Sequence, residues 1–408
     1  MTIPAYRGNM KHTPKAIIIG GGIAGPAVSL FLRRAGIESQ IFEAYPEPTT
    51  IGGGFQIAPN GMRVLNALGL ADQVSSAGVR SSEFVFRNQQ GRIIGRIDVS
   101  GSGYGITIRR SLFQRILMNE IGRQSVPIHY SKRLCAIEQT GDAVAARFED
   151  GTVETGDMLL AADGVHSRVR ALTLPENASP RYTGFLGIGG FAEAGSAVAN
   201  PEDAHRLSFT VGPRFQIGYA MVSEAPARWG WWTHLPQEKE LARRELQAIP
   251  AGSIRDRVLA AFGGWHSPIE ALVSSTEQIM RTAIYDVPSL PTWHVGRVML
   301  LGDAAHAMSP AGGQGASLAL EDAMLVGRSL ANQSGAVTQT FAAVEALLRA
   351  RAERMVKQAA LNDLRQVKEL GAFGQWMRNQ AFPLFAPLIA RELRRQYTAL
   401  QHMFAAAA

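Results

Sequence analysis

Cysteine is nearly absent from this chain, with Cys135 the only one among 408 residues. A single cysteine excludes an internal disulfide framework and is typical of a reducing compartment, so we expect a cytoplasmic location. We interpret Cys135, in the strand-like stretch RLCAIEQ, as a small buried apolar residue. The chain also lacks an uninterrupted apolar run long enough for a membrane-spanning helix. Residues 1–14 lack the apolar segment of a secretory signal, and we expect them to form a disordered tail.

Concentrated charge is missing as well. The net charge is +7, but the basic residues are scattered, and no aromatic-interleaved basic stripe of the nucleic-acid-binding type occurs. We therefore expect no nucleic-acid partner, and a monomer or homodimer acting on a small molecule. A hydrophobic share of 46% with 18% charged residues is typical of a folded protein. The positive balance suits anionic cofactors and substrates.

A glycine-rich stretch near the N-terminus has the pattern of a dinucleotide-binding βαβ unit. The apolar run Lys15–Ile19 predicts a buried parallel strand, and Gly20-x-Gly22-x-x-Gly25 follows it into a predicted helix. In this arrangement glycines permit a tight turn and a close approach of backbone to a pyrophosphate at the helix N-terminus. Glu43 ends the next predicted strand, where it would bind the adenosine ribose and disfavour a 2′-phosphate. The expected contacts are Gly20, Gly22, Ile23, Ala24, Gly25 and Glu43.

A second glycine-rich stretch, GDAAHAMSPAGGQGASLALEDA, occupies residues 302–323 and follows the apolar run Val298–Leu301. Ligands of parallel sheets bind beyond the carboxyl ends of strands, so this loop should reach the same site as the first. An ordinary NAD site does not need this second loop. FAD does, because its ribityl chain and tricyclic ring extend beyond the first loop. Asp303 can bond ribityl hydroxyls, and the helix beginning near Gly315 can stabilise a reduced flavin with its positive end. The expected contacts are Gly302, Asp303, Pro310, Gly312, Gly313, Gln314, Gly315 and Ala316.

Four blocks in order resemble the class A flavoprotein monooxygenases, the para-hydroxybenzoate hydroxylase family. They are GGGIAG with Glu43, IRRSLFQRIL, LAADGVHSRVR, and the 302–323 stretch. The resemblance implies that Arg109 contacts the phosphate and ribityl region of FAD. It also implies that Asp163 and Gly164 serve FAD and transient NAD(P)H, and that residues 310–315 flank the flavin ring. For Asp163, a turn carboxylate that stabilises its own loop is a second interpretation. Two positions depart from many relatives, Ala44 in place of arginine and Ser317 in place of asparagine.

The resemblance implies a two-domain α/β fold. A Rossmann-like FAD-binding domain of the glutathione-reductase type is interleaved with a mixed, mostly antiparallel β-sheet domain and followed by C-terminal helices. The expected boundaries are 15–72, 103–176 and 285–365 for the FAD-binding domain, 73–102 and 177–284 for the substrate-binding sheet domain, and 366–408 for a C-terminal helical segment.

Alternating apolar residues between Arg170 and Ile284 predict the strands of the sheet domain. Such a sheet can roof the flavin and form an apolar pocket. We expect Phe215, Tyr219, Met221 and Trp232 to line this pocket; Trp232 and His234 share a face of their strand. Pro383 and Pro387 should interrupt the C-terminal segment, which we expect to cap the pocket rather than form a dimer surface or touch a membrane.

The implied activity is aerobic hydroxylation or epoxidation of an electron-rich aromatic, polyketide-like or terpenoid molecule. NAD(P)H would reduce FAD, and dioxygen would react through a flavin C4a-hydroperoxide. The alternatives are a flavin-dependent reductase of a prenyl or alkene substrate and a flavin-binding redox-signalling protein. A flavin halogenase would need an early lysine, and none occurs between Ala16 and Ser131. A hydrolytic triad of Asp303, His306 and Ser309 is disfavoured because the chain has no G-x-S-x-G elbow. We expect no metal site, and the sequence names no catalytic side chain.

Overall fold

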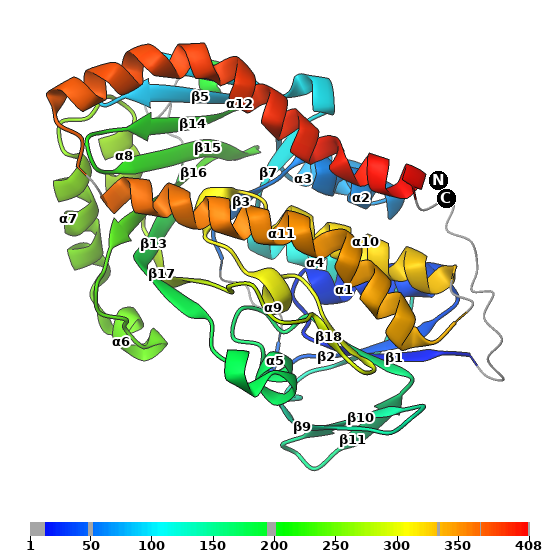
Figure 1. Ribbon diagram of the computed structural model, residues 1–408. Helices are drawn as coiled ribbons and strands as arrows, with labels where there is room; N and C mark the ends of the chain where they lie inside the picture. Colours follow the sequence, from blue (N-terminus) through cyan, green and yellow to red (C-terminus); the bar gives the residue numbers. More distant parts are fainter. Residues whose placement is uncertain (1–12, 48–51, 194–200, 333–334, 368, 407–408) are drawn as a thin grey trace.

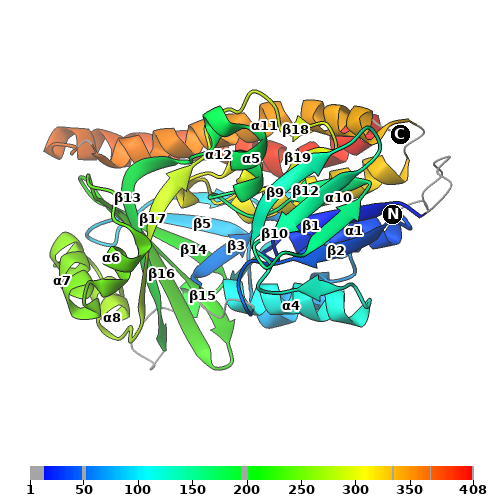
Figure 2. The same ribbon diagram turned by 90° about the horizontal axis from the view of Figure 1, so that it is seen from below.

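The structure is a computed structural model that describes residues 13–47, 52–193, 201–332, 335–367 and 369–406. Most of the predicted N-terminal tail lies outside the described residues. Two large sheets lie at opposite ends of the molecule, and the two longest helices run along one side of both (Figures 1 and 2).

The first sheet carries the N-terminal glycine loop. Its six strands have the order β18-β19-β12-β1-β2-β8, and neighbours pair in parallel except for the edge pair β18–β19. The central strands are almost entirely apolar, as required of strands that are covered on both faces. The predicted strand Lys15–Ile19 is confirmed as β1. The other strands are β2 (Glu38–Phe42), β8 (Ile128–His129), β12 (Met158–Ala161), β18 (His294–Val295) and β19 (Val298–Leu300).

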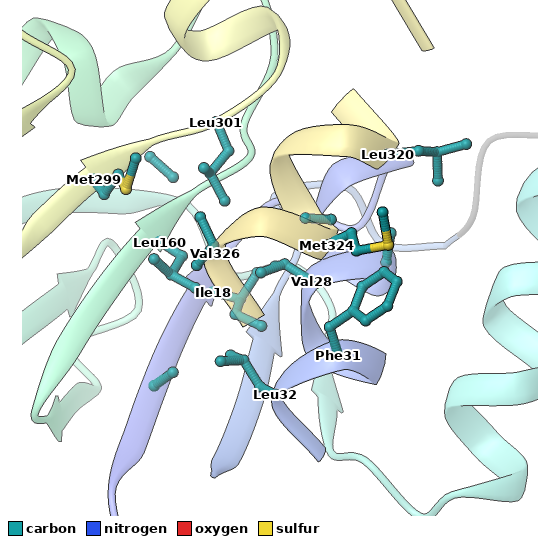
Figure 3. Close-up of a cluster of buried hydrophobic side chains, with 14 of the residues drawn as sticks. Ile18, Val28, Phe31, Leu32, Leu160, Met299, Leu301, Leu320, Met324 and Val326 are labelled. Atoms are coloured by element: carbon teal, nitrogen blue, oxygen red, sulfur yellow. The ribbon is translucent and has the colours of Figure 1, made fainter. Parts of the chain in front are cut away.

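Helices α1 and α10 pack on this sheet and on each other. The predicted helix after the glycine loop is confirmed as α1, Ala24–Arg34, and α10 spans Gly315–Ala331. Figure 3 shows the apolar cluster that joins the two helices to the strands. Because each helix begins at a glycine loop, this packing brings the two loops to the same end of the sheet. The labelled members of the cluster are Ile18, Val28, Phe31, Leu32, Leu160, Met299, Leu301, Leu320, Met324 and Val326.

The second sheet has the order β17-β13-β16-β15-β14-β5-β6, with antiparallel neighbours except for β14–β5. The expected mixed, mostly antiparallel sheet is therefore confirmed. Helices α6, α7 and α8 cover one of its faces. Its strands are β5 (Glu83–Asn88), β6 (Ile93–Asp98), β13 (Arg181–Glu193), β14 (Arg206–Val211), β15 (Gln216–Glu224), β16 (Ala227–Pro236) and β17 (Ile279–Asp286); the helices are α6 (Arg243–Ala248), α7 (Ala251–Phe262) and α8 (Ile269–Ser274).

Two small three-stranded sheets and several short helices complete the body of the molecule. The sheet β3-β7-β4 lies between the two large sheets, and β11-β10-β9 forms an outer flap (Figure 2). Cys135 is half-buried in β9, and its Sγ donates to the Arg147 carbonyl. The remaining elements are β3 (Gly54–Ile57), β4 (Val79–Ser81), β7 (Gly105–Arg109), β9 (Leu134–Gln139), β10 (Val144–Phe148), β11 (Val153–Gly156), α2 (Pro59–Ala67), α3 (Ala71–Ala77), α4 (Arg110–Arg123), α5 (Arg168–Thr173), α9 (Asp303–His306), and the 3₁₀ turns η1 (Ser100–Ser102), η2 (Pro175–Asn177), η3 (Pro201–Asp203) and η4 (Pro310–Gly312).

Helices α11 (Val337–Val367) and α12 (Ala372–Ala406) end the chain. The prediction that Pro383 and Pro387 interrupt the C-terminal segment is wrong, because α12 continues through both prolines (Figure 1). The helix packs along strand β6 and against α2, and this tertiary packing holds the segment helical despite the missing N–H groups. Of the helices within the described ranges, none combines the length and the apolarity that a membrane crossing requires.

Candidate functional site

One cavity of about 2730 Å³ connects the two glycine loops. It is lined by Gly20–Ala24 from the first loop and by Pro310–Ala316 from the second, together with Glu43 and Asp303. The cavity continues to the uncovered face of the seven-stranded sheet. Pockets that hold one drug-sized ligand measure about 300–1,000 Å³, so this cavity has room for a dinucleotide and a second molecule.

The first loop requires its glycines. Gly20 has a φ of +107°, and a β-carbon there would lie 2.3 Å from the Ala162 carbonyl oxygen. A β-carbon on Gly25 would lie 2.0 Å from the Gly20 carbonyl oxygen, so Gly25 serves the close packing of α1 on the strand and does not itself line the cavity. A β-carbon on Gly22 would meet no protein atom within 4 Å. Protein backbone therefore packs closely against Gly20 and Gly25, whereas Gly22 leaves room for a ligand.

Glu43 lies at the end of β2, where its carboxylate holds the glycine loop in place. Its Oε2 accepts a hydrogen bond of 2.7 Å from the Gly21 N–H, and its Oε1 accepts one of 2.9 Å from the Tyr45 N–H. Helix α1 has no side-chain cap and no acidic residue in its first turn. The first turn of α1 therefore faces the cavity without an acidic residue of its own, which suits a pyrophosphate.

The second loop begins at Gly302, which has a φ of +55° and is buried outside the cavity lining. Asp303 follows and lines the cavity; a β-carbon on Gly315 would lie 3.9 Å from its Oδ1. Helix α10 likewise begins without a side-chain cap or an acidic first turn. At its N-cap, Gln314 is buried, and its Oε1 has no hydrogen-bond partner within the described residues. The uncapped N–H groups of α10 and the unpartnered Gln314 Oε1 are therefore available to hydrogen-bond the polar edge of a ligand.

His306 belongs to the support of this loop. Its Nε2 lies 2.7 Å from Asp322 Oδ2, which also accepts the Gly302 N–H at 2.8 Å. Burial acts to lower the pKa of His306, but the neighbouring Asp322 carboxylate outweighs burial and raises the pKa above its ordinary value. The Trp293 ring packs over the imidazole with centroids 5.0 Å apart. A buried histidine bound to a carboxylate holds the loop's first turn in place.

Asp163 lines the cavity and also stabilises its own loop. Its Oδ1 accepts a 2.6 Å hydrogen bond from Ser167 Oγ, and its Oδ2 accepts one of 3.0 Å from the Val169 N–H at the start of α5. Burial raises the pKa of Asp163. Gly164 follows with a φ of +81° and also lines the cavity. The turn-stabilising interpretation of Asp163 is thus compatible with a ligand role.

Arg170, which sequence reasoning missed, ties this loop to the second glycine stretch. It is fully buried and donates to the Ala304 carbonyl at 2.9 Å and to the Val165 carbonyl at 2.6 Å. The signal was present, because the quoted block LAADGVHSRVR ends with this arginine.

Arg109 is half-buried at the end of β7 and is not among the residues that line the cavity, whereas exposed Arg110 is. Thr107, two residues earlier on the same strand face, lines the cavity, as does Gly54, the cross-strand partner of Arg109. Arg109 therefore sits at the cavity edge on the strand face that borders the cofactor region.

Two of the four predicted substrate residues line the cavity. They are Trp232 and Phe215, although Phe215 also packs against Phe262 of α7 on the helix-covered side of the sheet. Tyr219 and Met221 do not line the cavity, which corrects the prediction: their face of β15 packs against α6–α8, and Tyr219 is buried with its hydroxyl 3.4 Å from Arg87 Nη1. The alternating apolar residues of β15 do share one buried face, but helices α6–α8, and not the cavity, cover that face.

The cavity face of the sheet carries an aromatic wall, of which the sequence predicted only Trp232. Trp232 and Phe209 meet edge to face with ring centroids 5.8 Å apart. The strand between them offers Gly218, where a β-carbon would lie 2.4 Å from the Trp232 ring. Phe86 stacks on Phe209 at 5.3 Å and contacts Phe382 of α12 at 4.8 Å. The lining residues that α11 and α12 add include Met355, Gln358, Ala359, Asn362, Arg378, Phe382 and Tyr397.

Comparison with known proteins agrees with this geometry. Residues 13–359 match the model of the family described as FAD binding domain. The chain is 32% identical over 362 residues to a 3-amino-4-hydroxybenzoate 2-monooxygenase of Streptomyces cremeus, covering 85% of this chain and 88% of that relative. It is 30% identical over 332 residues to a 6-hydroxynicotinate 3-monooxygenase of Pseudomonas fluorescens, covering 79% and 83%. The structure of Klebsiella pneumoniae HpxO complexed with FAD and uric acid is similar, with a TM-score of 0.78 and 26% identity over 94% of this chain and 93% of that one.

The fold and the joined loops define a flavin-dependent oxidoreductase, in which the first loop and Glu43 suit the adenosine diphosphate half of FAD and the second loop suits the ribityl and ring half. Within that class the chain belongs to the FAD-binding monooxygenase family, and it is an FAD-dependent monooxygenase.

Proposed function

We propose that this enzyme takes electrons from NAD(P)H and one oxygen atom from dioxygen to hydroxylate an electron-rich aromatic or heteroaromatic small molecule. The observation that carries the proposal is the continuity of one cavity from the two cofactor loops to the aromatic wall formed by Phe86, Phe209 and Trp232. Aromatic side chains favour a flat ring substrate through offset or edge contacts. The names of the relatives, which refer to an aminohydroxybenzoate and a hydroxynicotinate, support an aromatic ring over a polyketide or a terpenoid.

Bound FAD supplies the redox chemistry, and the protein's task is to bind, orient and exclude water. The free N-terminus of α1 would hold the pyrophosphate, while Asp303 and the Pro310–Gly315 segment would hold the ribityl chain and the ring. Arg109, at the edge of the cavity, would contact the phosphate and ribityl region. The Asp163–Gly164 turn would border the path of NAD(P)H. The aromatic wall would keep bulk water away from the reacting atoms.

Arg214 and Arg378 line the cavity and give it a positive character that suits an acidic or phenolic substrate. Burial lowers the pKa of Arg378, whose guanidinium donates to the Gly212 carbonyl at 2.6 Å. The positive charges of these arginines would attract a substrate carboxylate or phenolate into the cavity even without a direct ion pair.

The test is turnover by the purified yellow protein. A panel of hydroxylated benzoates, pyridines and purines is supplied with NADH or NADPH in air, and products are analysed by mass spectrometry. We expect substrate-dependent NAD(P)H consumption and a product that gains one oxygen atom. Reduction of a prenyl or alkene substrate without oxygen gain would indicate the reductase alternative, and flavin binding without turnover of any candidate would indicate a signalling role.

A further inference from the structure

Two ionisable side chains from distant parts of the chain meet at the cavity face of the seven-stranded sheet. His234 extends from β16, and its Nδ1 lies 3.4 Å from Oδ1 of Asp363 on α11. The side chains are only 6% and 3% exposed. His234 shares its strand face with Trp232, and both residues line the cavity. The pair therefore stands beside the aromatic wall and is screened from bulk water.

The arrangement fixes which ring nitrogen is available. Asp363 is nearly fully buried, and its Oδ2 has no hydrogen-bond partner among the described residues. A buried carboxylate in this position favours a proton on the nearer nitrogen, Nδ1, so that it can accept that hydrogen bond. The lone pair then resides on Nε2, for which the described part of the chain provides no partner. The free nitrogen is a base held on a cavity wall.

The pair also lies close to the region expected to hold the flavin ring. Ala359 of α11 contacts the second glycine loop, since a β-carbon on Gly312 would lie 3.1 Å from the Ala359 β-carbon. Asp363 follows one helical turn later, which is about 6 Å along the helix axis. A substrate ring placed between the Pro310–Gly313 turn and Trp232 would thus have the imidazole at its edge. Gly187, the cross-strand partner of His234, has no side chain to fill the space beside it.

We propose that His234, oriented by Asp363, is the base that removes the hydroxyl proton of the substrate. The substrate O–H bond breaks, its electron pair stays on oxygen, and an N–H bond forms at Nε2. Asp363 stabilises the resulting imidazolium, and the same proton returns to the product oxygen when the product leaves. The ionised oxygen makes the ring carbon ortho or para to it more electron-rich, which an electrophilic oxygen transfer requires.

The inference rests on the proposed function and narrows its substrate to a class. That class is a ring with a neutral hydroxyl, such as a phenol, an enol or a hydroxylated nitrogen heterocycle, which must ionise before it is oxygenated. His234 is the catalytic residue of the pair and Asp363 is a positioning residue. The other ionisable side chains that line the cavity from the neighbouring elements are Arg214 of the β14–β15 turn, Arg243 of α6, Arg281 and Tyr285 of β17, and Arg378, Glu392 and Tyr397 of α12. The four arginines outnumber the one carboxylate of this set, Glu392, and favour a phenolate in the cavity.

The first test follows ionisation directly with 4-nitrophenol as a probe, because its phenolate is coloured. The flavin-loaded enzyme is titrated with the probe at a pH below the pKa of free 4-nitrophenol, and the difference spectrum is recorded. Wild type should show the phenolate band, and His234→Gln should lose it. His205→Gln, which changes an exposed histidine outside the cavity, should behave as wild type. A wild-type enzyme that produces no phenolate band, or a His234→Gln variant that keeps it, overturns the proposal.

The second test uses whichever substrate the turnover screen identifies. His234→Gln should lower kcat/KM by about 10²- to 10⁴-fold, the usual range for general base catalysis. The loss should shrink at high pH, where the substrate ionises without help. Asp363→Asn should show the same pH-dependent defect with a smaller factor, and Asp363→Glu should recover part of it. A uniform loss at every pH would mean a purely structural role and would contradict the assignment.

The experiments distinguish failure of the base assignment from failure of the proposed function. Phenolate formation on a protein that hydroxylates no substrate would support His234 as the base and refute the proposed function. Hydroxylation at an unchanged rate in His234→Gln would support the proposed function and refute the base assignment.

Discussion

Gly327 of α10 lies so close to Phe31 of α1 that a β-carbon on the glycine would fall 2.4 Å from the Phe31 β-carbon. The two helices are the ones that begin at the two glycine loops. Their close packing therefore sets the separation between the pyrophosphate end and the flavin end of the site.

Gly327→Ala should force these helices apart. Overpacking a tight interface costs about 1–3 kcal/mol, so we expect a lower melting temperature and a weaker hold on FAD. Gly122→Ala is the matched control, because Gly122 lies in helix α4 and its added β-carbon would meet nothing within 4 Å. Thermal unfolding of both variants, followed by flavin fluorescence, decides the matter. Equal melting temperatures for Gly327→Ala and Gly122→Ala would mean that the α1–α10 contact accommodates a β-carbon without cost, which would contradict this account.

Asp303→Ala should yield largely colourless protein, since Asp303 lines the cavity at the start of the second loop, where its carboxylate would bind ribityl hydroxyls. Asp256→Ala, at an exposed position of α7, should purify as yellow as wild type. The measurement is the ratio of flavin to protein absorbance after purification. Full flavin retention by Asp303→Ala would refute the ribityl assignment.

Arg109 and Arg110 form a natural pair for testing the phosphate contact. Loss of a charge-assisted contact costs about 1–3 kcal/mol, so Arg109→Ala should weaken FAD binding accordingly. Arg110→Ala should have a smaller effect, because Arg110 is exposed at the first position of α4 while Arg109 is half-buried at the cavity edge. Titration of the apoprotein with FAD measures both. The opposite order would transfer the contact to Arg110, which lines the cavity.

The His306–Asp322 pair predicts a pH dependence of stability. Asp322 raises the pKa of His306 above 6.5 in the folded state. The folded chain therefore binds a proton at His306 more tightly than the unfolded chain does. The stabilisation is fully present below the unfolded pKa and is lost as the pH rises through the folded pKa. His306→Asn removes this linkage. The melting temperature of wild type minus that of His306→Asn should therefore decrease as the pH rises above 6.5, the ordinary pKa of histidine. A difference that stays constant or grows would contradict a raised pKa of His306.

Local sequence determined much of the fold. The strand Lys15–Ile19, the helix that follows it and the second glycine loop could be predicted because their signals lie within a few neighbouring residues. The face of β15 could not, because apolar alternation marks a buried face without saying whether helices or a cavity cover it. Tyr219 and Met221 were assigned to the wrong side for this reason.

Long-range pairing accounts for the other omissions. His234 and Asp363 are 129 positions apart, and neither residue carries a local signal that points to the other. The aromatic wall likewise combines Phe86, Phe209 and Trp232 from three separate segments. The continuity of α12 through Pro383 depends on its packing against β6, which its own sequence does not reveal.

The central claim is that both glycine loops bind the same FAD molecule. A crystal structure of the yellow enzyme tests it most directly. The account predicts the pyrophosphate against Gly22 and the N-terminus of α1, the ribityl chain beside Asp303, and the flavin ring along Pro310–Gly315 with one face toward Trp232 and His234. A flavin ring bound away from the 310–315 segment, with the second loop facing a different ligand, would contradict it.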